Sequence, residues 1–432
     1  MLQKLNESPA GIGGLHVHAP PGFQADPKQT VKSVDLRVLV VNGGSSSIKF
    51  ALFEAGDPVQ LIFQGAIEGI GRPGSALHVR GPSSSDNLTR PLIASDHPAA
   101  VTALIGWLEE RLGHEGLAGV GHRVVHGGPS FSEPRPVTAD LVKELRRLSP
   151  FDPEHLPGEI LLVEAFQRWL PSVPQVACFD TAFHRDLPRV ARLLPLPRRF
   201  EAQGVRRYGF HGLSYEFLMG ELTRLGDPAA ATGRVILAHL GSGASLCAVL
   251  DGKSIDTSMS FTPTAGLPMS TRSGDLDPGL VGYLARTENM SAKQFHDLVN
   301  FKSGLLGMSE TSSDIRDLLD CEPRDVRAAE AIALFCYQVK KWIGAFAAAL
   351  GGLDTLVFAG GIGENSPAVR ARICAGLAFL GVELEREPNV KGEGLISTKA
   401  GRVAVRVIAT SEEHVIAKAV CRVLGPTWNH DN

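Results

Sequence analysis

Residues Leu36 to Glu54, LRVLVVNGGSSSIKFALFE, predict a strand, a glycine-serine turn and a second strand. The β-branched run Val38 to Val41 and the apolar run Ile48 to Phe53 are typical of the two strands. Between them, Asn42 to Ser47 offers small residues, backbone N–H groups and hydroxyls, and Lys49 adds a positive charge. Such a turn lets phosphate oxygens approach the backbone closely, although the pattern is equally typical of an ordinary glycine-rich hairpin.

The same pattern recurs near the middle of the chain. Arg234 to Gly252, RVILAHLGSGASLCAVLDG, aligns with the first stretch without a gap, so that Ala51 corresponds to Ala248. A third glycine turn follows an apolar strand in Leu353 to Ser366, LDTLVFAGGIGENS. Two hairpins and a strand-to-helix turn predict two similar lobes that hold one polyphosphate between them.

Length and composition exclude several classes of protein. A chain of 432 residues with 44% hydrophobic residues predicts two soluble domains, and its net charge of −3 gives no reason to expect a nucleic-acid or membrane partner. No apolar run approaches membrane-spanning length and no signal-peptide core is present, so we expect a cytoplasmic protein. The 6 cysteines lack C-x-x-C spacing, which favours free thiols over disulfides or zinc.

The domain organisation is predicted from the stretches of the chain that lack a regular pattern. Residues 1–33 lack periodicity and predict a disordered extension. We expect an N-terminal lobe formed by residues 34–182 together with 413–426, a helix that closes back onto it, and a C-terminal nucleotide-binding lobe formed by residues 183–412. The long irregular stretch Asp256 to Pro278 favours a binding role over a passive connection.

Ordered motifs along the chain resemble the acetate kinase family from Leu36 to Leu424. They are VLVVNGGSSSIKF, GHRVVHGG, FDTAFH, YGFHGLS, HLGSGAS, DTSMSFTP, TRSGDLDP, FAGGIGENS and TSEEHVIA. That family belongs to the sugar kinase, heat-shock ATPase and actin superfamily. The resemblance therefore implies an α/β fold of two duplicated ribonuclease-H-like, actin-like ATPase lobes with the active site in the cleft between them. It also implies Mg²⁺-dependent (Mn²⁺ possible), reversible in-line transfer of the ATP γ-phosphoryl group to acetate, giving acetyl phosphate, and a homodimer.

The residues themselves fit phosphoryl transfer to a carboxylate. A carboxylate is already ionised at pH 7, so no general base is needed to make the nucleophile. The obstacle is the approach of two anions, which calls for cations and hydrogen-bond donors. Arg123 in GHRVVHGG and Arg272 in TRSGD provide planar forks that suit carboxylate or phosphate oxygens, although each alone would be typical of a structural ion pair. The resemblance implies that Arg123 binds the substrate and that Arg272 stabilises the transferring group.

The resemblance assigns further roles. His211 would stabilise the transition state, where the alternative is a core histidine, and Asp180 is the active-site carboxylate; we interpret Asp180 as orienting an arginine or a magnesium-bound water. Asn42 and Glu412 match magnesium ligands. Val125, Phe210 and Pro263 match the acyl pocket. The implied ATP-binding residues are Lys49, His239, Leu240, Gly241, Ser242, Gly243, Asp314, Ile315, Arg316, Gly361, Ile362, Gly363, Glu364 and Asn365. For Asp314 and Arg316 the alternative is a solvated ion pair.

Three positions depart from the family pattern. Ser242 replaces the usual Asn, Tyr215 replaces the usual second His, and Glu154 replaces an apolar residue of the acyl pocket. We expect Glu154 to pair with Arg123 or His155, or to turn to solvent, because an unpaired buried charge is costly. A propionate or butyrate kinase, and a non-catalytic actin-like nucleotide-binding protein, are the alternative functions.

Overall fold

The computed structural model describes residues 36–44, 46–83, 86–112 and 117–425. The extension predicted for residues 1–33 lies outside these residues. Residues Asp35 to Asn432 form one unit, so the predicted division into two lobes at residues 182 and 412 stays a prediction. Within the described ranges, no helix is long and apolar enough to cross a membrane.

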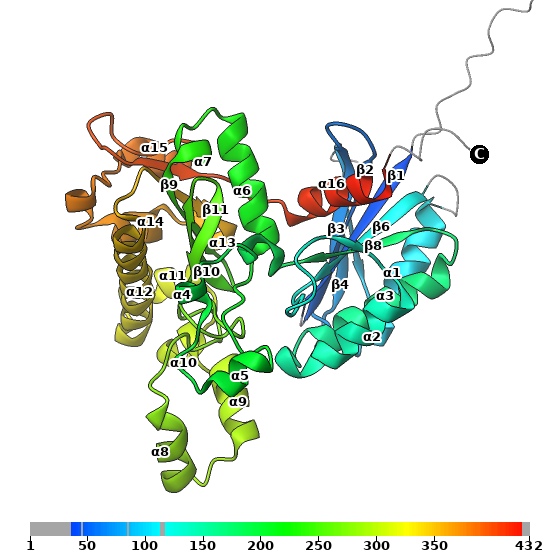
Figure 1. Ribbon diagram of the computed structural model, residues 1–432, viewed down its shortest axis with the longest axis horizontal. Coiled ribbons are helices and arrows are strands. Elements are labelled where there is room, and N and C mark those ends of the chain that lie inside the picture. The colour runs from blue at the N-terminus through cyan, green and yellow to red at the C-terminus, as the bar shows by residue number, and fades with distance from the viewer. Residues whose placement is uncertain (1–35, 45, 84–85, 113–116, 426–432) are drawn as a thin grey trace, which may run out of the picture. The chain divides into compact units, whose positions relative to one another are not determined.

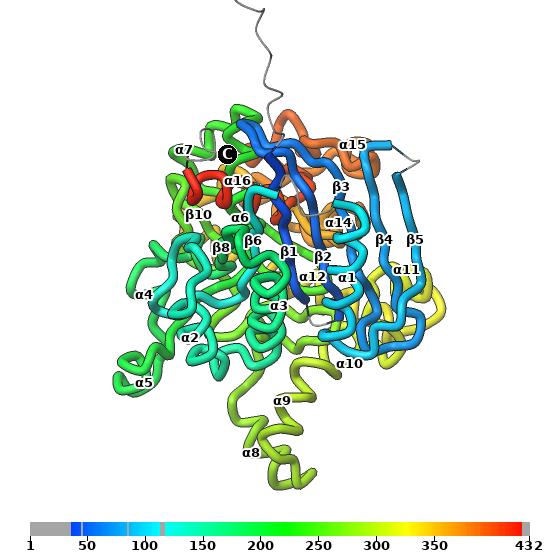
Figure 2. Tube along the Cα trace, turned by 90° about the vertical axis from the view of Figure 1, so that its right-hand side faces the viewer, coloured from blue at the N-terminus to red at the C-terminus, as the bar shows by residue number. Residues whose placement is uncertain are grey.

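The first sheet has the strand order β5-β4-β3-β2-β1-β6-β8-β7. Strands β1 to β5 form an antiparallel meander that Figure 2 shows side by side, while β6 runs parallel to both β1 and β8. The bounds are β1 Arg37–Gly43, β2 Ser47–Glu54, β3 Gln60–Glu68, β4 Ala76–Arg80, β5 Leu88–Pro91, β6 Leu117–Val124, β7 Arg135–Pro136 and β8 Gln175–Phe179.

Helices cover both faces of the first sheet because side chains alternate along its central strand. Leu39 and Val41 share an apolar cluster with α1 (His97–Leu112) and α3 (Leu156–Trp169), and α2 (Ala139–Leu148) packs on α3. Val38 and Val40 face the other way and share a cluster with α16 (Glu412–Leu424). The last helix of the chain therefore packs on the first sheet (Figure 1).

The second sheet repeats the arrangement of the first. Its order is β11-β10-β9-β12-β13, with β9 antiparallel to β10 and parallel to β12, as β1 is antiparallel to β2 and parallel to β6. The bounds are β9 Arg234–Leu240, β10 Ala244–Leu250, β11 Lys253–Thr257, β12 Thr355–Ala359 and β13 Ala404–Val407. Helix α12 (Val326–Leu350) packs on one face and α6 (Gly212–Arg224) on the other. The duplication thus extends beyond the hairpins to five strands of each sheet.

The register of the hairpins corrects the gapless alignment. In the first hairpin Gly43 pairs with Ile48, which leaves four residues between them, whereas in the second Leu240 pairs with Ala244, which leaves three. The two first strands therefore correspond residue for residue, but the two second strands are offset by one position. Beyond the turn, the gapless sequence alignment therefore matches residues that lie one position apart in the two hairpins.

The remaining helices connect these sheets. The predicted strand-to-helix turn is present, since helix α14 begins at Pro367 with Ser366 as its N-cap. The glycine turn itself is also helical, because α13 begins at Gly360. The stretch predicted to be irregular, Asp256 to Pro278, begins with the last two residues of β11 and contains no further helix or strand from Ser258 onward. The other bounds are α4 Arg189–Arg192, α5 Arg198–Ala202, α7 Ala229–Thr232, α8 Gly279–Thr287, α9 Ala292–Phe301, α10 Gly304–Ser309, α11 Ile315–Cys321, α13 Gly360–Asn365, α14 Pro367–Cys374 and α15 Arg386–Lys391.

Candidate active site

All three glycine turns open into one cavity of about 440 Å³. The cavity is also lined by both predicted metal ligands and by every predicted catalytic and substrate-binding residue. The lining residues are Asn42, Gly44, Ser46, Ser47, Lys49, Arg123, Val125, His155, Asp180, Phe210, His211, His239, Gly241, Ser242, Gly243, Pro263, Arg272, Gly360, Gly361, Glu364, Thr410, Glu412 and Glu413. The structure therefore brings together side chains that are separated by up to several hundred positions in sequence.

Arg123, at the end of β6, is surrounded by carboxylates. Its Nη2 donates to Asp180 Oδ2 at 2.5 Å and its Nη1 donates to Glu159 Oε1 at 3.2 Å, while Glu412 Oε2 lies 3.9 Å from Nε. The Nε atom is buried and makes no hydrogen bond to any described residue. Each Nη atom thus already donates one N–H to the protein, and the guanidinium keeps its remaining N–H groups for a ligand.

This crowding changes the protonation of the site. Burial, outweighing the attraction of Arg123, raises the pKa of Glu159 to about 8. Burial and the nearby charge of Asp180 raise the pKa of Glu412 to about 7. Burial would lower the pKa of Arg123, but the attraction of these carboxylates outweighs it and raises that pKa. The cluster therefore keeps the arginine charged while holding protons on part of its acidic shell near neutral pH.

His211 is held in an uncommon backbone conformation. It is the N-cap of α6 and has φ 58°, the left-handed region that non-glycine residues rarely adopt. The N–H of Gly212 donates to the backbone oxygen of Asp180 at 2.8 Å, and a Cβ on Gly212 would lie 2.1 Å from that oxygen. Such residues cluster at functional sites, where surrounding contacts hold them in place.

A buried chain of hydroxyls sets the tautomer of His211. Ser245 Oγ lies 2.8 Å from His211 Nδ1 and is also hydrogen-bonded to the hydroxyl of Tyr215. Burial raises the pKa of Tyr215 well above its usual 10, so its hydroxyl keeps its proton, and Ser245 is its hydrogen-bond partner among the described residues. Tyr215 therefore donates to Ser245, and Ser245 donates to Nδ1. Since burial also lowers the pKa of His211 well below 6.5, the ring is neutral and carries its proton on Nε2.

His211 and Arg272 face the same point of the second glycine turn. A Cβ placed on Gly243 would lie 3.3 Å from His211 Nε2 and 3.6 Å from Arg272 Nη1, so a glycine here lets both donors approach the turn. Arg272 Nη1 donates to the backbone oxygen of Pro263 at 3.2 Å, and Arg272 forms no ion pair with a described residue. Burial lowers the pKa of Arg272 below the usual arginine value and outweighs the attraction of Asp152, as expected for a desolvated cation without an ion-pair partner.

The predicted metal ligands lie together at the first glycine turn. Asn42 Nδ2 donates to Glu412 Oε2 at 3.2 Å, which leaves Asn42 Oδ1 and Glu412 Oε1 available. Asp180 Oδ1 is buried and has no hydrogen-bond partner among the described residues. Three oxygens of this kind fit Mg²⁺, which prefers oxygen ligands and keeps most of its waters. The described residues contain no group of three or more His, Cys, Asp or Glu side chains that could hold a metal by themselves.

Some predicted ATP-binding residues do not line the cavity. Leu240, Ile362 and Gly363 are buried beneath it. Asp314, Ile315, Arg316 and Asn365 lie outside the lining. Arg316 Nη2 lies 2.6 Å from Asp314 Oδ2, and the Arg316 side chain is 83% exposed, which is the solvated ion pair named as the alternative.

Glu154 turns outward to solvent, which is one of the two outcomes expected for it. It lies outside the lining of the cavity, so it is not part of the pocket wall, and its Oε1 accepts a hydrogen bond from His296 Nε2 at 2.8 Å. The other expected outcome, a pair with Arg123 or His155, does not occur, because Arg123 is occupied by other carboxylates and His155 Nδ1 lies 2.8 Å from Asp152 Oδ1. His155, not Glu154, is the residue of this loop that reaches the cavity.

Sequence reasoning missed the residues that support the site. Glu159 lies on a helix whose other buried positions are apolar, and a carboxylate in such a stripe was the available signal. Ser245 and Thr410 carried no signal, because a single hydroxyl in a strand or loop is common.

Comparison with known proteins identifies the family of this chain. The model of the acetokinase family matches residues 37–418. The chain belongs to the acetokinase family. An acetate kinase from Rhodopseudomonas palustris is 46% identical over 391 residues, covering 89% of this chain and 98% of that protein. A propionate kinase from Citrobacter rodentium is 42% identical over 396 residues, covering 90% of this chain and 96% of that protein.

A solved structure of an acetate kinase has a similar fold. The crystal structure of Porphyromonas gingivalis acetate kinase superposes with a TM-score of 0.81 at 36% identity, covering 90% of this chain and all of that one (100%). Together with the two sheets of matching topology, this confirms the predicted α/β fold of duplicated actin-like ATPase lobes. The acetokinase motifs quoted from the sequence are therefore the ones that build the cavity.

Proposed function

We propose that this protein is an acetate kinase that transfers the γ-phosphoryl group of ATP to acetate, giving acetyl phosphate and ADP. The observation that carries the proposal is the convergence of Arg123, His211 and Arg272 with three glycine turns in one cavity. Glycine turns suit a polyphosphate, and the three donors suit a second anion brought against it. Relatives named acetate kinase at 46% identity support the choice of acetate.

The proposed mechanism assigns each group one task. The carboxylate of acetate is bound through the N–H groups of Arg123 that the protein leaves free, with its methyl group against Val125, Phe210 and Pro263. One carboxylate oxygen attacks the γ-phosphorus, the bond from phosphorus to the bridging β,γ-oxygen breaks, and ADP leaves with that electron pair. Neutral His211 donates from Nε2 and Arg272 donates from its free guanidinium nitrogens to the equatorial oxygens of the transferring group. Asp180 orients Arg123. No proton transfer is required, because the carboxylate of acetate is already ionised at pH 7.

Magnesium is proposed as the metal, held by Asn42 and Glu412 with Asp180 nearby. Bound there, it would neutralise charge on the phosphate oxygens of ATP. The uncommitted oxygens of these three residues support the assignment. The glycine turns that follow β1, β9 and β12 are proposed to hold the phosphates, with Lys49 as a point charge beside them.

The direct test is incubation of the protein with ATP, magnesium and acetate, with the acyl phosphate trapped by hydroxylamine. The expected result is acetate-dependent formation of hydroxamate together with ADP. Binding of ATP without acetate-dependent formation of ADP or hydroxamate would instead support the non-catalytic actin-like alternative.

Propionate is the second candidate substrate, because relatives named propionate kinase are 42% identical over 90% of this chain. The two substrates differ by one methylene, which a hydrophobic pocket discriminates by only about 1–3 kcal/mol. Comparing kcat/KM for acetate, propionate and butyrate decides between them. A higher value for propionate would replace acetate as the substrate and leave the reaction type intact. A homodimer is also proposed from the family resemblance, and light scattering of the purified chain tests it.

A further inference from the structure

A second cavity, of about 330 Å³, lies apart from the proposed active site. We call it the arginine cavity, because Arg185, Arg192, Arg206 and Arg207 line it. Its other lining residues are Gly128, Pro129, Phe131, Ser132, Thr181, His184, Asp186 and Tyr208. None of these residues lines the first cavity.

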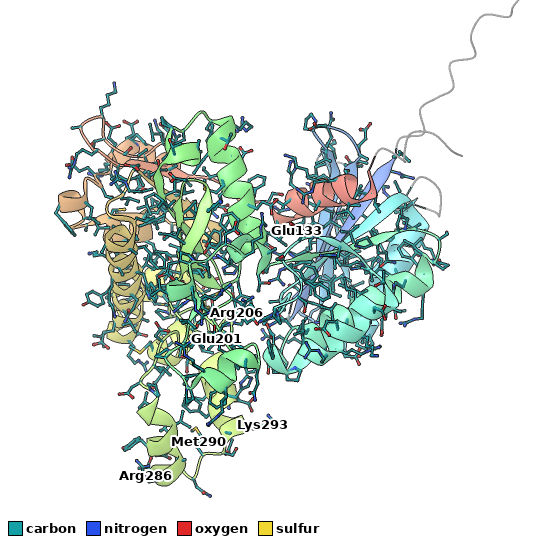
Figure 3. All side chains as sticks on the ribbon, in the orientation of Figure 1. Glu133, Glu201, Arg206, Arg286, Met290 and Lys293 are labelled. Carbon is teal, nitrogen blue, oxygen red and sulfur yellow. The ribbon has the colours of Figure 1, made fainter. Side chains whose placement is uncertain are left out.

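The arginines of this cavity are poorly compensated by acidic groups. Asp186 is the only carboxylate among the described residues that line it. Arg185, Arg192 and Arg206 form no ion pair with a described residue, and Arg207 has Asp256 only at the 4.0 Å limit. Glu201 (labelled with Arg206 in Figure 3) binds Arg189 at 2.7 Å and attracts Arg192 without forming an ion pair with it, and Glu216 attracts Arg185 in the same way. Four guanidinium groups around one space repel one another unless an anion lies between them.

The cavity wall holds these groups in place. The guanidinium carbon of Arg206 lies 4.8 Å from the centroid of the Tyr208 ring, and its Nε is buried without a hydrogen-bond partner among the described residues. Arg207 is anchored by donating to the backbone oxygens of Ala191 at 3.1 Å and Thr257 at 2.8 Å. Thr181 Oγ1 accepts from the N–H of Gly127 at 3.1 Å, so its own hydroxyl proton is available to a ligand. Stacked and anchored arginines lose little freedom when they bind an anion.

We propose that the arginine cavity is a second anion site, which binds a small ligand with two or more closely spaced negative oxygens. Guanidinium forks match phosphate most closely, because planar paired donors bind two oxygens at once. A compact dicarboxylate shares this chemistry and is the other source to be distinguished. The site is independent of the proposed kinase reaction, since it shares no lining residue with the first cavity.

The test uses the full chain and titrates inorganic phosphate, and separately malonate, at constant ionic strength kept with sodium chloride. Binding is followed by calorimetry and by the rise in Tm. We expect Arg206→Gln and Arg192→Gln each to weaken binding of the preferred anion about tenfold, the loss of one charge-assisted hydrogen bond. Arg198→Gln is the matched control, because Arg198 lies near the same acid, 3.8 Å from Glu201, but outside the cavity lining. It should bind as the wild type does.

Any phosphate bound in the first cavity contributes equally to all these chains, because that cavity is unchanged in each of them. The anion with the lower Kd, phosphate or malonate, shows whether the natural ligand is a phosphate or a dicarboxylate. If Arg206→Gln unfolds through loss of its packing on Tyr208, Arg192→Gln decides alone. Saturable binding that is weakened by Arg192→Gln or Arg206→Gln, but not by Arg198→Gln, supports the site. Absence of saturable binding in the wild type, or equal affinity in all four chains, would overturn the proposal whether or not the protein phosphorylates acetate.

Discussion

Tyr215 donates its buried hydroxyl to Ser245, and this bond decides which nitrogen of a third residue, His211, carries the proton. The phenol has to donate, and the serine that accepts from it passes its own proton to His211 Nδ1. The Nε2–H group then points to the second glycine turn, where a Cβ on Gly243 would lie 3.3 Å away. Tyr215, which departs from the family pattern, thus completes the site without lining it.

Replacing Ser245 by Ala should therefore lower kcat roughly tenfold, because about 1.4 kcal/mol of hydrogen bonding to His211 is lost. KM for ATP should change little. Tyr215→Phe should have a smaller effect, since Ser245 can still donate. The ¹⁵N shifts of the His211 ring should show the Nε2–H tautomer in the wild type and a mixture in Ser245→Ala. An Nδ1–H tautomer in the wild type would refute this hydrogen-bond direction.

Arg272→Ala and His211→Ala should each lower kcat by about two to three orders of magnitude, as loss of one preorganised donor commonly does. Arg123→Ala should in addition raise KM for acetate, because the remaining N–H groups of Arg123 are proposed to bind the substrate carboxylate. Arg286→Ala is the control, since Arg286 is exposed on α8 (Figure 3) and should keep wild-type kcat. Near wild-type turnover in all three site variants would show that the assigned cavity is not where phosphoryl transfer occurs.

Glu154→Leu should leave KM for acetate within about twofold of the wild type, because Glu154 lies outside the lining of the first cavity. The partly exposed pair Glu154–His296 contributes only about 0–1 kcal/mol to stability. Val125→Phe is the contrasting variant, because Val125 is 2% exposed and lines the first cavity, so that KM for acetate should rise severalfold. Steady-state kinetics with varied acetate measures both. A marked gain in acetate affinity in Glu154→Leu would restore Glu154 to the pocket wall.

Arg316→Ala should raise KM for ATP severalfold with kcat nearly unchanged, if the segment Asp314 to Arg316 binds the nucleoside as the family resemblance implies, since uniform binding affects KM alone. The same variant removes the surface ion pair with Asp314. Thermal unfolding of the variant separates the two roles. An unchanged KM for ATP with a slightly lower Tm would show that the pair caps the N-terminus of α11 and does not bind the nucleoside.

Acidification should destabilise the fold through its buried histidines. Burial lowers the pKa of His184 to about 4, as it does for His122, His126 and His239. The unfolded chain, with histidine pKa values near 6.5, then binds more protons than the folded chain. The stabilisation is complete above pH 6.5 and falls as the pH decreases toward 4, by at most about 1.4 kcal/mol per pH unit for each histidine.

Denaturant unfolding at several pH values between 7.5 and 5 measures this slope. His184→Gln should reduce the slope by up to one proton, whatever its effect on absolute stability. Equal slopes in wild type and His184→Gln would show that His184 is protonated in the folded chain.

The sequence by itself was sufficient to predict the local elements and the chemistry. Alternating and β-branched runs predicted β1, β2, β9 and β10, and repetition of the glycine-serine turn predicted the duplicated sheets. These features are local, because strand periodicity and turn residues act over a few positions. The type of reaction could also be predicted, because a pair of arginines beside phosphate-binding turns suits two anions.

Only the tertiary structure decided how these residues are joined. The one-residue offset between the hairpins depends on ladder pairing, which no residue type in the turn reveals. Arg123 meets Asp180 and Glu159 because β6, β8 and α3 place their ends together, and Glu154 meets His296 across 142 positions. Such contacts depend on which elements pack against one another, and a buried charge takes whichever partner that packing brings within reach.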